Sequence, residues 1–380
     1  MVCASLPSLN DTSIHTLDSS GCPSCNTRTL WHILLSCGLT LFACTWTAIH
    51  TNIPTMGQGK VSFTYYRMVY MVMGLIAPEV IITWAAEEFF SARWTMTHGF
   101  FAWMGGFMLH VNGRPRATLT PDELLQFVRD GSVDMPVISE EEIEDRSKGD
   151  GLSKGIALLQ LVWFAIQFFA RYINNLPNTL LETDALAIAA LTCISYGLWW
   201  KKPKDVRCPY IVHWKAAASP SRLTNEYADS SRSSPVDPIA EEVRPSAVRS
   251  RRLIFLGDHG TRSYVLSIGC FSVMVFGGIH CLGWNYLTQG GATIWRVASL
   301  MTVSAPVLFY LGTGYQLHAD RPFDSALMTF VTCAAPLGLI TYVIARAILV
   351  AFIIMSLIPP LPPGVYDTVA WTTYIPHFQI

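Results

Sequence analysis

Apolar blocks of about twenty residues alternate along the chain with polar stretches that hold nearly all of the charged residues. Such a block, wound as an α-helix, matches the roughly 30 Å hydrocarbon core of a bilayer. Because backbone polar groups cannot stay unpaired in lipid, eight blocks predict an all-α helical membrane bundle with about eight transmembrane helices. The predicted spans are Leu30–His50, Tyr66–Trp84, Trp94–Val111, Gly155–Ile173, Leu180–Trp200, Ser263–Trp284, Thr293–Leu311 and Ala326–Ile344.

The last apolar region continues through Ala347–Ile358 and is too long for one upright helix. We therefore expect a span, a break near Arg346 and then an interfacial segment, which the prolines that begin at Pro359 terminate. The third block is short and contains Gly105 and Gly106, which would allow close packing against a neighbouring helix.

Composition agrees with a membrane location and narrows the function classes. Hydrophobic residues make up 51% of the 380 residues and charged residues only 14%, whereas about 25% charge is usual in soluble domains. The net charge of −1, without a concentrated basic surface, gives no indication of nucleic-acid binding. Histidines are scattered along the chain and form no ligand cluster, so neither a metal nor a cofactor is expected.

The distribution of lysine and arginine predicts the orientation. With eight spans and the N-terminus outside, 21 of the 26 lysine and arginine residues fall on the inner side, as the positive-inside rule requires. The N-terminus would then be lumenal or extracellular, in an endomembrane or the plasma membrane. The sequon at Asn10 would carry a glycan there. No cleavable signal peptide is expected, because polar residues fill the segment before the first block.

This orientation divides the chain into lumenal, membrane and cytoplasmic parts. Two helix-start signatures, at Thr120 and Ser139, indicate that the first of the two long cytoplasmic loops is partly helical. Residues 216–252 are rich in serine, proline and charge, and we expect them to be disordered. The parts are 1–29 as the outer segment, 30–111 with spans one to three, 112–154 as the first cytoplasmic loop, 155–200 with spans four and five, 201–262 as the second loop, 263–358 with spans six to eight and the interfacial segment, and 359–380 as the C-terminal tail.

Several local strings, taken together in their order and spacing, resemble a known group of proteins. They are Cys44–Pro54 (CTWTAIHTNIP), Ala77–Glu79 (APE), Trp94–Phe107 (WTMTHGFFAWMGGF), Asp145–Asp150 (DRSKGD), Leu159–Arg171 (LQLVWFAIQFFAR), Trp199–Val206 (WWKKPKDV) and Pro363–His377 (PGVY, then Trp371 and IPH). The chain resembles a large group of fungal polytopic membrane proteins of uncharacterised activity. The resemblance covers nearly the whole chain and implies fold and location, but no reaction.

Two departures from that group affect the prediction. Many of its members open with a signal peptide, which is not expected here. They also often carry an acid just after the arginine that corresponds to Arg346, whereas the residues that follow here, from Ala347 to Phe352, are apolar. The ion pair that the resemblance implies at this place therefore has no obvious partner in the sequence.

Ionisable residues inside spans cost about 2.5–3.5 kcal/mol each on insertion scales, so each requires an explanation. Glu79, after Pro78 in the second span, is the clearest case. Under the eight-span topology the polar residues that map to the outer halves of their helices are Glu79, His98, Arg171, Glu182, His280, Arg296 and Arg346.

Two interpretations of this set stay open. In the functional one, the residues line an outward-facing pocket for a lipophilic small molecule. Glu79 would then act as acid or base, and His98 and His280 would relay protons. The residues that bind the substrate would be Arg171, Glu182, Arg296 and Arg346. In the structural interpretation these are helix-end residues near headgroups, or pairs such as Glu79–Arg171 that fix the packing.

A second candidate site precedes the fourth span. Arg146, Lys148 and Lys154 flank a predicted helix start, where a phosphate or an anionic lipid headgroup could bind. The alternative is a capped surface helix whose charges are solvated.

Three functions are compatible with the sequence. The preferred one is a membrane protein that binds a lipophilic small molecule and isomerises or cyclises it by acid–base chemistry. The alternatives are a small-solute transporter and a non-catalytic scaffold or receptor that acts through its cytoplasmic loops. Membrane lipids are the expected partners; the sequence leaves the oligomeric state and the enzyme status open.

Overall fold

The computed structural model describes residues 27–53, 60–92, 95–147, 151–215, 259–287, 289–318 and 325–369. Asn10, Lys148 and the predicted disordered segment 216–252 lie outside the described residues.

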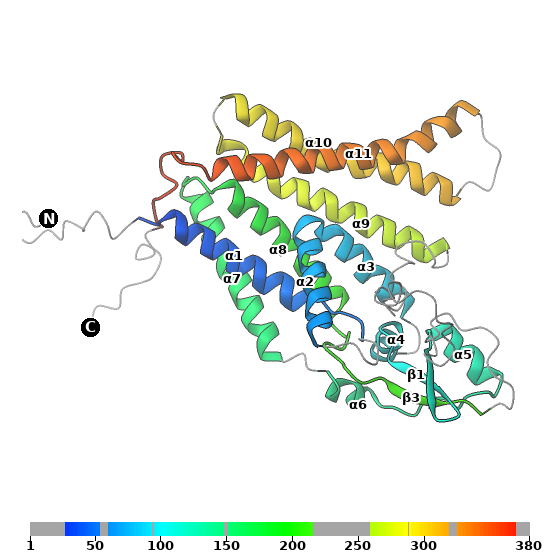
Figure 1. The fold of residues 1–380 in the computed structure, drawn as a ribbon. Coiled ribbons are helices and arrows are strands. Elements are labelled where there is room, and N and C mark those ends of the chain that lie inside the picture. Colours follow the sequence, from blue (N-terminus) through cyan, green and yellow to red (C-terminus); the bar gives the residue numbers. More distant parts are fainter. Residues whose placement is uncertain are drawn as a thin grey trace, which may run out of the picture.

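Most of the described chain is helical, and a small sheet lies at one end (Figure 1). The helices are α1 Leu30–Ala48, α2 Lys60–Ile76, α3 Pro78–Ser91, α4 Met96–Trp103, α5 Pro121–Arg129, α6 Glu140–Asp145, α7 Gly151–Ile173, α8 Leu180–Leu198, α9 His259–His280, α10 Gln289–His318 and α11 Ser325–Ser356, with a 3₁₀ turn at Cys281–Asn285. The strands are β1 Phe107–Val111, β2 Arg114–Thr118 and β3 Tyr210–His213.

Six helices within the described ranges are long and apolar enough to cross a bilayer, and the bent pair α2–α3 is a further candidate. The six are α1, α7, α8, α9, α10 and α11, each with an apolar stretch of 19 to 24 residues, close to the roughly 20 residues that a span needs. The predicted multi-pass helical bundle is therefore confirmed. Eight straight spans are not found.

The second predicted span, Tyr66–Trp84, is two helices rather than one. The chain bends by 113° between α2 and α3, around Ala77. Pro78 is the cause, because proline lacks a backbone N–H and disfavours helical geometry in the residue before it. Ala77 accordingly has φ −142° and ψ 71°, and α3 begins at Pro78.

The third predicted span, Trp94–Val111, is also wrong, because it consists of the eight-residue helix α4 followed by strand β1. Gly105 ends the helix with φ +87°. At Gly106 a Cβ atom would lie 2.4 Å from the Phe101 ring, so a larger residue does not fit. Asn112 and Gly113 both have positive φ, which is the turn chemistry of a tight β-hairpin.

The sheet has the order β2-β1-β3, with β1 antiparallel to β2 and parallel to β3. The all-α prediction is therefore corrected to a mainly helical fold with a three-stranded sheet. Residues from α4, α5, the strands and the intervening loops bury a separate apolar core that includes Phe101, Phe107, Leu109, Leu124 and Val212. The predicted helix starts are confirmed, because capping boxes at Thr120 and Ser139 open α5 and α6.

Both legs of the α2–α3 hairpin start from the end of the bundle that carries the sheet. Arg67 on α2 pairs with Asp205 at 2.9 Å, and Glu88 on α3 pairs with Lys202 at 2.7 Å. Both partners lie just beyond the end of α8. The apex contacts Arg346, which lies ten residues before the end of α11, roughly 15 Å along the helix axis. The apex is thus inside the bundle (Figure 1).

The predicted break near Arg346 does not occur, since α11 continues from Ser325 to Ser356. Ala347–Ile358 is therefore largely part of the last helix and not a separate interfacial segment. The Arg346 guanidinium donates hydrogen bonds to Asp184 and to two backbone carbonyls inside the bundle. Because its charge is paired there, α11 can continue past Arg346 without exposing that charge to lipid.

Helices α9 and α10 approach each other closely at Gly277. A Cβ atom at Gly277 would lie 2.8 Å from Cγ2 and 2.9 Å from the backbone nitrogen of Val303, whereas a Cβ atom at Gly278 would meet nothing within 4 Å. Small residues at such a contact allow two membrane helices to pack backbone to backbone.

We expect Gly277→Ala to destabilise the protein by about 1–3 kcal/mol through overpacking. Gly278→Ala is the matched control, and it should be neutral or slightly stabilising because alanine favours the helix. Thermal unfolding of the two purified variants in detergent measures the difference. Equal unfolding temperatures would contradict the close contact between α9 and α10.

Candidate functional site

Buried polar side chains gather at three levels of the bundle. The terminal clasp, at the end opposite the sheet, consists of Arg28, Arg171, Glu182 and the backbone of 364–367. The hairpin cluster, around the apex of α2–α3, consists of Glu79, Asp184, His280, Tyr342 and Arg346. The sheet-end cluster consists of Arg67, Glu88, Lys202 and Asp205.

In the hairpin cluster, Glu79 occupies the first turn of α3, where a negative charge is favoured by the helix dipole. Its side chain is buried, and its Oε1 accepts a hydrogen bond of 2.6 Å from the Tyr342 hydroxyl. Among the described residues its Oε2 has no hydrogen-bond partner. A buried acceptor without a partner costs about 1–3 kcal/mol, so this oxygen is suited to bind a further donor.

Arg346 holds the broken helix in place. Its guanidinium donates to Asp184 Oδ1 at 3.1 Å and to the carbonyls of Leu75 and Ile76, both at 3.3 Å. It also lies 3.9 Å from the centre of the Phe276 ring. The last carbonyls of a helix have no partner within the helix, so Arg346 supplies the donors that the end of α2 lacks.

His280 completes the hairpin cluster at the end of α9. The side chain is fully buried, with Nδ1 2.8 Å from the carbonyl oxygen of Phe276 and Nε2 3.2 Å from Asp184 Oδ1. Four helices, α3, α8, α9 and α11, therefore each contribute a polar side chain to one cluster.

A small cavity lies beside the residue before Glu79, and exposed apolar side chains lie at the apex and on α11. The cavity, with space for about one water molecule, lies beside Pro78 and is lined by Thr45, Gly74, Thr192 and Ser195 among others. Toward the outside, Tyr342 is only half-buried. The neighbouring side chains of the apex and of α11 are exposed, Ile76 by 63% and Val343 by 56%.

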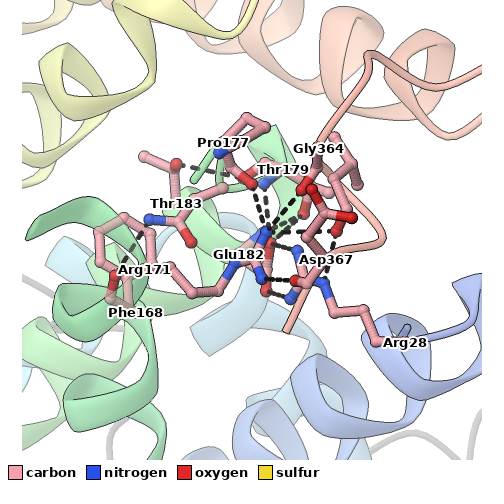
Figure 2. Close-up of polar contacts among 11 residues, drawn as sticks. Arg28, Phe168, Arg171, Pro177, Thr179, Glu182, Thr183, Gly364 and Asp367 are labelled. Carbon is pink, nitrogen blue, oxygen red and sulfur yellow. Dashed lines mark hydrogen bonds and ion pairs between the residues drawn. The ribbon is translucent and has the colours of Figure 1, made fainter. Parts of the chain in front are cut away.

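The terminal clasp joins the described segments before α1 and after α11 to the α7–α8 loop (Figure 2). Arg28 forms a two-point ion pair with Glu182 and donates to the Val365 carbonyl. Arg171 donates to the carbonyls of Pro177 and Asp367. Glu182 also closes a capping box with Thr179 at the start of α8. These contacts fix the segments before α1 and after α11 side by side.

The sheet-end cluster contains a fully buried lysine. Lys202 Nζ donates to Glu88 Oε2 at 2.7 Å and lies 5.1 Å and 4.8 Å from the centres of the Trp84 and Trp199 rings, which contact each other. The indole nitrogens of both tryptophans donate to the same carboxylate. Burial lowers the pKa of Lys202, and the adjacent Glu88 carboxylate opposes this shift. The pair joins the far end of α3 to the end of α8.

The structure brings together only some of the residues predicted as one site. Glu79, His280 and Arg346 share the hairpin cluster, whereas Arg171 and Glu182 belong to the terminal clasp. The predicted Glu79–Arg171 pair is not formed, because Arg171 binds backbone carbonyls.

His98 and Arg296 lie elsewhere. Glu79 lies at the start of α3, and His98 lies beyond its other end. The helix between them is about 20 Å long. The His98 imidazole contacts the Ile138 carbonyl and the Thr95 hydroxyl, so it ties α4 to the loop between α5 and α6. Arg296 is exposed and lies over the Trp284 ring.

Of the predicted phosphate site, Arg146 and Lys154 lie within the described residues and Lys148 does not. Arg146 lies near the Cys208 carbonyl and the Tyr210 ring, and Lys154 near the Trp200 ring. Binding of a headgroup by these residues stays a prediction.

Several residues of these clusters were not predicted. Asp184 lies inside a predicted span, two positions after Glu182. A charged residue inside a span is itself a sequence signal of a functional or structural role, so Asp184 could have been predicted. Lys202 lies within WWKKPKDV, one of the strings that carry the family resemblance. Tyr342 has no distinguishing sequence signal. The strings themselves meet in space: in CTWTAIHTNIP, Thr47 and Asn52 accept hydrogen bonds from Lys204 and Lys202 of WWKKPKDV.

The fold and these buried clusters define a multi-pass integral membrane protein. A model of a family of unknown function, DUF8562, matches residues 6–96 and 92–241. Because this match covers more than half of the chain, the protein belongs to that family. No curated protein and no solved structure matches the chain. The family match includes the α2–α3 hairpin, Asp184 and the sheet-end cluster.

The buried Glu88–Lys202 pair predicts a double-mutant result. Lys202→Met should cost about 3–5 kcal/mol, because it leaves the Glu88 carboxylate buried without its cation. The double variant Lys202→Met/Glu88→Gln should recover most of this loss. Lys215→Met is the control: Lys215 pairs with Asp134 on the surface, and such pairs contribute about 0–1 kcal/mol. Chemical unfolding in detergent measures all three. A double variant no more stable than the single one would contradict the pairing.

Proposed function

We propose that this protein binds a lipophilic small molecule inside the membrane and acts on it by acid–base chemistry at Glu79. The observation that carries the proposal is the Glu79 carboxyl group. It is buried between helices, with one oxygen held by the Tyr342 hydroxyl and the other without a partner among the described residues. Such a group can accept a proton from a ligand or donate one to it without first giving up another contact.

Tyr342 fixes the carboxyl in one orientation, which leaves Oε2 as the reacting atom. A positioned acid or base of this kind contributes roughly 10²–10⁴-fold to a proton-transfer rate. The reaction class that suits one carboxyl group and an apolar substrate is isomerisation or cyclisation, in which a proton leaves one carbon atom or is added to another. His98 lies on α4, beyond the far end of α3, and takes no part in this chemistry.

The route to the site supports a lipophilic substrate. Tyr342 is half-buried, and the exposed side chains next to it, Ile76 and Val343, are apolar. On a helix that crosses a bilayer, exposed apolar side chains face lipid. A substrate dissolved in the membrane would therefore reach the Glu79–Tyr342 pair sideways, by displacing side chains at the hairpin apex.

Transport of a small solute is the second candidate, because broken helices inside a membrane often form the binding sites of transporters. Here the helix ends at the break already have partners within the chain, since Arg346 binds the carbonyls that end α2 and Tyr342 binds Glu79 in the first turn of α3. This occupancy favours the enzyme over the transporter.

The contacts also support a topology. The terminal clasp joins the start of α1, the end of α7, the start of α8 and the segment after α11. If α1 crosses the membrane away from the clasp and α7 crosses back to it, the α2–α3 pair between them must enter and leave the membrane on the same side. The pair is then a re-entrant hairpin, and six spans place both termini on the outer side with the sheet in the cytoplasm.

Glycan mapping tests this topology. We expect Asn10 and an engineered sequon after Ile380 to be glycosylated, and the same sequon placed in the β1–β2 turn at Asn112–Gly113 to stay unmodified. If α2–α3 were one net span, the sheet and the C-terminus would exchange sides. The turn sequon would then carry the glycan and the C-terminal one would not. Mobility shifts after glycosidase treatment distinguish the two patterns.

A lipid profile tests the activity. In a deletion strain we expect a specific apolar metabolite to disappear and a precursor isomer to accumulate, as measured by mass spectrometry of lipid extracts. Wild-type protein should restore the profile and Glu79→Gln should not. Tyr342→Phe should lower the product about 2- to 10-fold, because it removes one hydrogen bond to the carboxyl.

The control for Tyr342→Phe is Tyr264→Phe, since Tyr264 is an exposed tyrosine on α9 and its change should leave the profile intact. Equal profiles in the wild-type and deletion strains would contradict the enzyme function. A metabolite that changes compartment while its total amount stays constant would favour the transporter.

A further inference from the structure

Both ring nitrogens of His280 face an oxygen atom that accepts hydrogen bonds. Both contacts are favourable only if the ring carries two protons or if the Asp184 carboxyl group carries one. Nδ1 faces the carbonyl oxygen of Phe276, which can only accept, and Nε2 faces the carboxyl oxygen of Asp184. A neutral imidazole carries one N–H, so one of its nitrogens would direct a lone pair at an acceptor. With Asp184 ionised through its contact with Arg346, only the imidazolium satisfies both contacts.

Charge balance then links His280 to Glu79. Uncompensated charge in a low-dielectric interior costs several kcal/mol per ion. With Asp184 and Arg346 ionised and paired, the hairpin cluster is neutral in two states. Glu79 is either a carboxylate while His280 is an imidazolium, or a carboxylic acid while His280 is a neutral imidazole.

Among the described residues, the groups that hydrogen-bond to the His280 side chain or backbone carbonyl from the packed helices are Asp184 of α8 and the Trp295 indole of α10, which donates to the His280 carbonyl oxygen. Arg346 of α11 reaches His280 through Asp184 and the Phe276 ring. The Arg28–Glu182 ion pair of the terminal clasp is neutral in itself. His280 is fully buried and has no contact with Glu79 in the described structure, so it cannot touch a substrate bound there.

We propose that Glu79 and His280 share one proton, and that Asp184, His280 and Arg346 are positioning residues that set the protonation state of the Glu79 carboxyl. This inference rests on the proposed function and names the regulation of its site. When the shared proton lies on His280, Glu79 is a carboxylate; when it lies on Glu79, His280 is a neutral imidazole that has lost one ring contact. From the second state Glu79 Oε2 donates the proton to one carbon of the substrate, and the carboxylate so formed takes a proton from another carbon of the same molecule. No proton is gained or lost overall, and the charge of the cluster and substrate together stays zero.

The experiment is solid-state NMR of the full chain in lipid bilayers, with ¹⁵N-labelled histidine rings. His280→Asn assigns the signal. In the wild type at pH 8, where an ordinary histidine is neutral, the His280 ring should give an imidazolium signal. Glu79→Gln removes one negative charge from the cluster without touching His280, and the imidazolium signal should be lost. Glu87→Gln is the matched control, because it makes the same change in α3 outside the cluster, and it should keep the signal.

A reciprocal measurement covers the case in which one variant fails to fold. His280→Gln leaves Arg346, Asp184 and Glu79 with one excess negative charge, so Glu79 should become protonated. Infrared spectra should then show a new protonated-carboxyl stretch that disappears in the double variant His280→Gln/Glu79→Gln. A His280 ring that stays charged in Glu79→Gln, or that is neutral in the wild type, would overturn the shared proton.

These outcomes are independent of the lipid profile. If Glu79→Gln changes the His280 signal but leaves the metabolites as in the wild type, the shared proton stands and the proposed enzyme function fails. If the metabolites change while the His280 signal does not, the enzyme function stands and the coupling fails.

Discussion

The structure depends on how the backbone of a broken helix is satisfied inside an apolar bundle. At the α2–α3 break the last carbonyls of α2 have lost their helical partners, and lipid offers none. Arg346 supplies the donors, and Asp184 balances its charge. This one requirement accounts for the uninterrupted course of α11 and for an aspartate inside α8. Arg346, the cation that binds the broken end of α2, also places a positive charge near Glu79.

The two outer clusters keep the apex in register. Arg67 and Glu88 bind the legs of the hairpin to residues just after α8, so neither leg can slide along the bundle without breaking a buried ion pair. At the opposite end, Arg28 and Arg171 hold the segments just before α1 and after α11 against the α7–α8 loop. With both ends of the bundle fixed, the distance between Glu79 and Tyr342 is determined by packing.

The sequence predicted the six long apolar helices, although it ended the last one too early, near Arg346. Their length and apolarity are set by the bilayer. The sequence also predicted the α5 and α6 starts from their caps. It failed at Trp94–Val111, where apolar side chains serve a small sheet core, although Asn112–Gly113 is a hairpin signal. The hairpin cluster could be predicted only in part. Glu79 stands out as a charge in a span, but its partner Tyr342 is 263 residues away, and no local pattern records a contact of that length.

Glu79 differs from the other buried acids in the kind of partner it has. Glu88, Glu182, Asp184 and Asp205 each accept a hydrogen bond from a lysine or an arginine. A proton added to any of them breaks an ion pair and leaves a buried cation, which costs about 3–5 kcal/mol. Glu79 accepts from a neutral hydroxyl, so its protonation breaks no direct ion pair. Of these carboxyl groups it is therefore the one that can gain and lose a proton with the least disturbance of the fold.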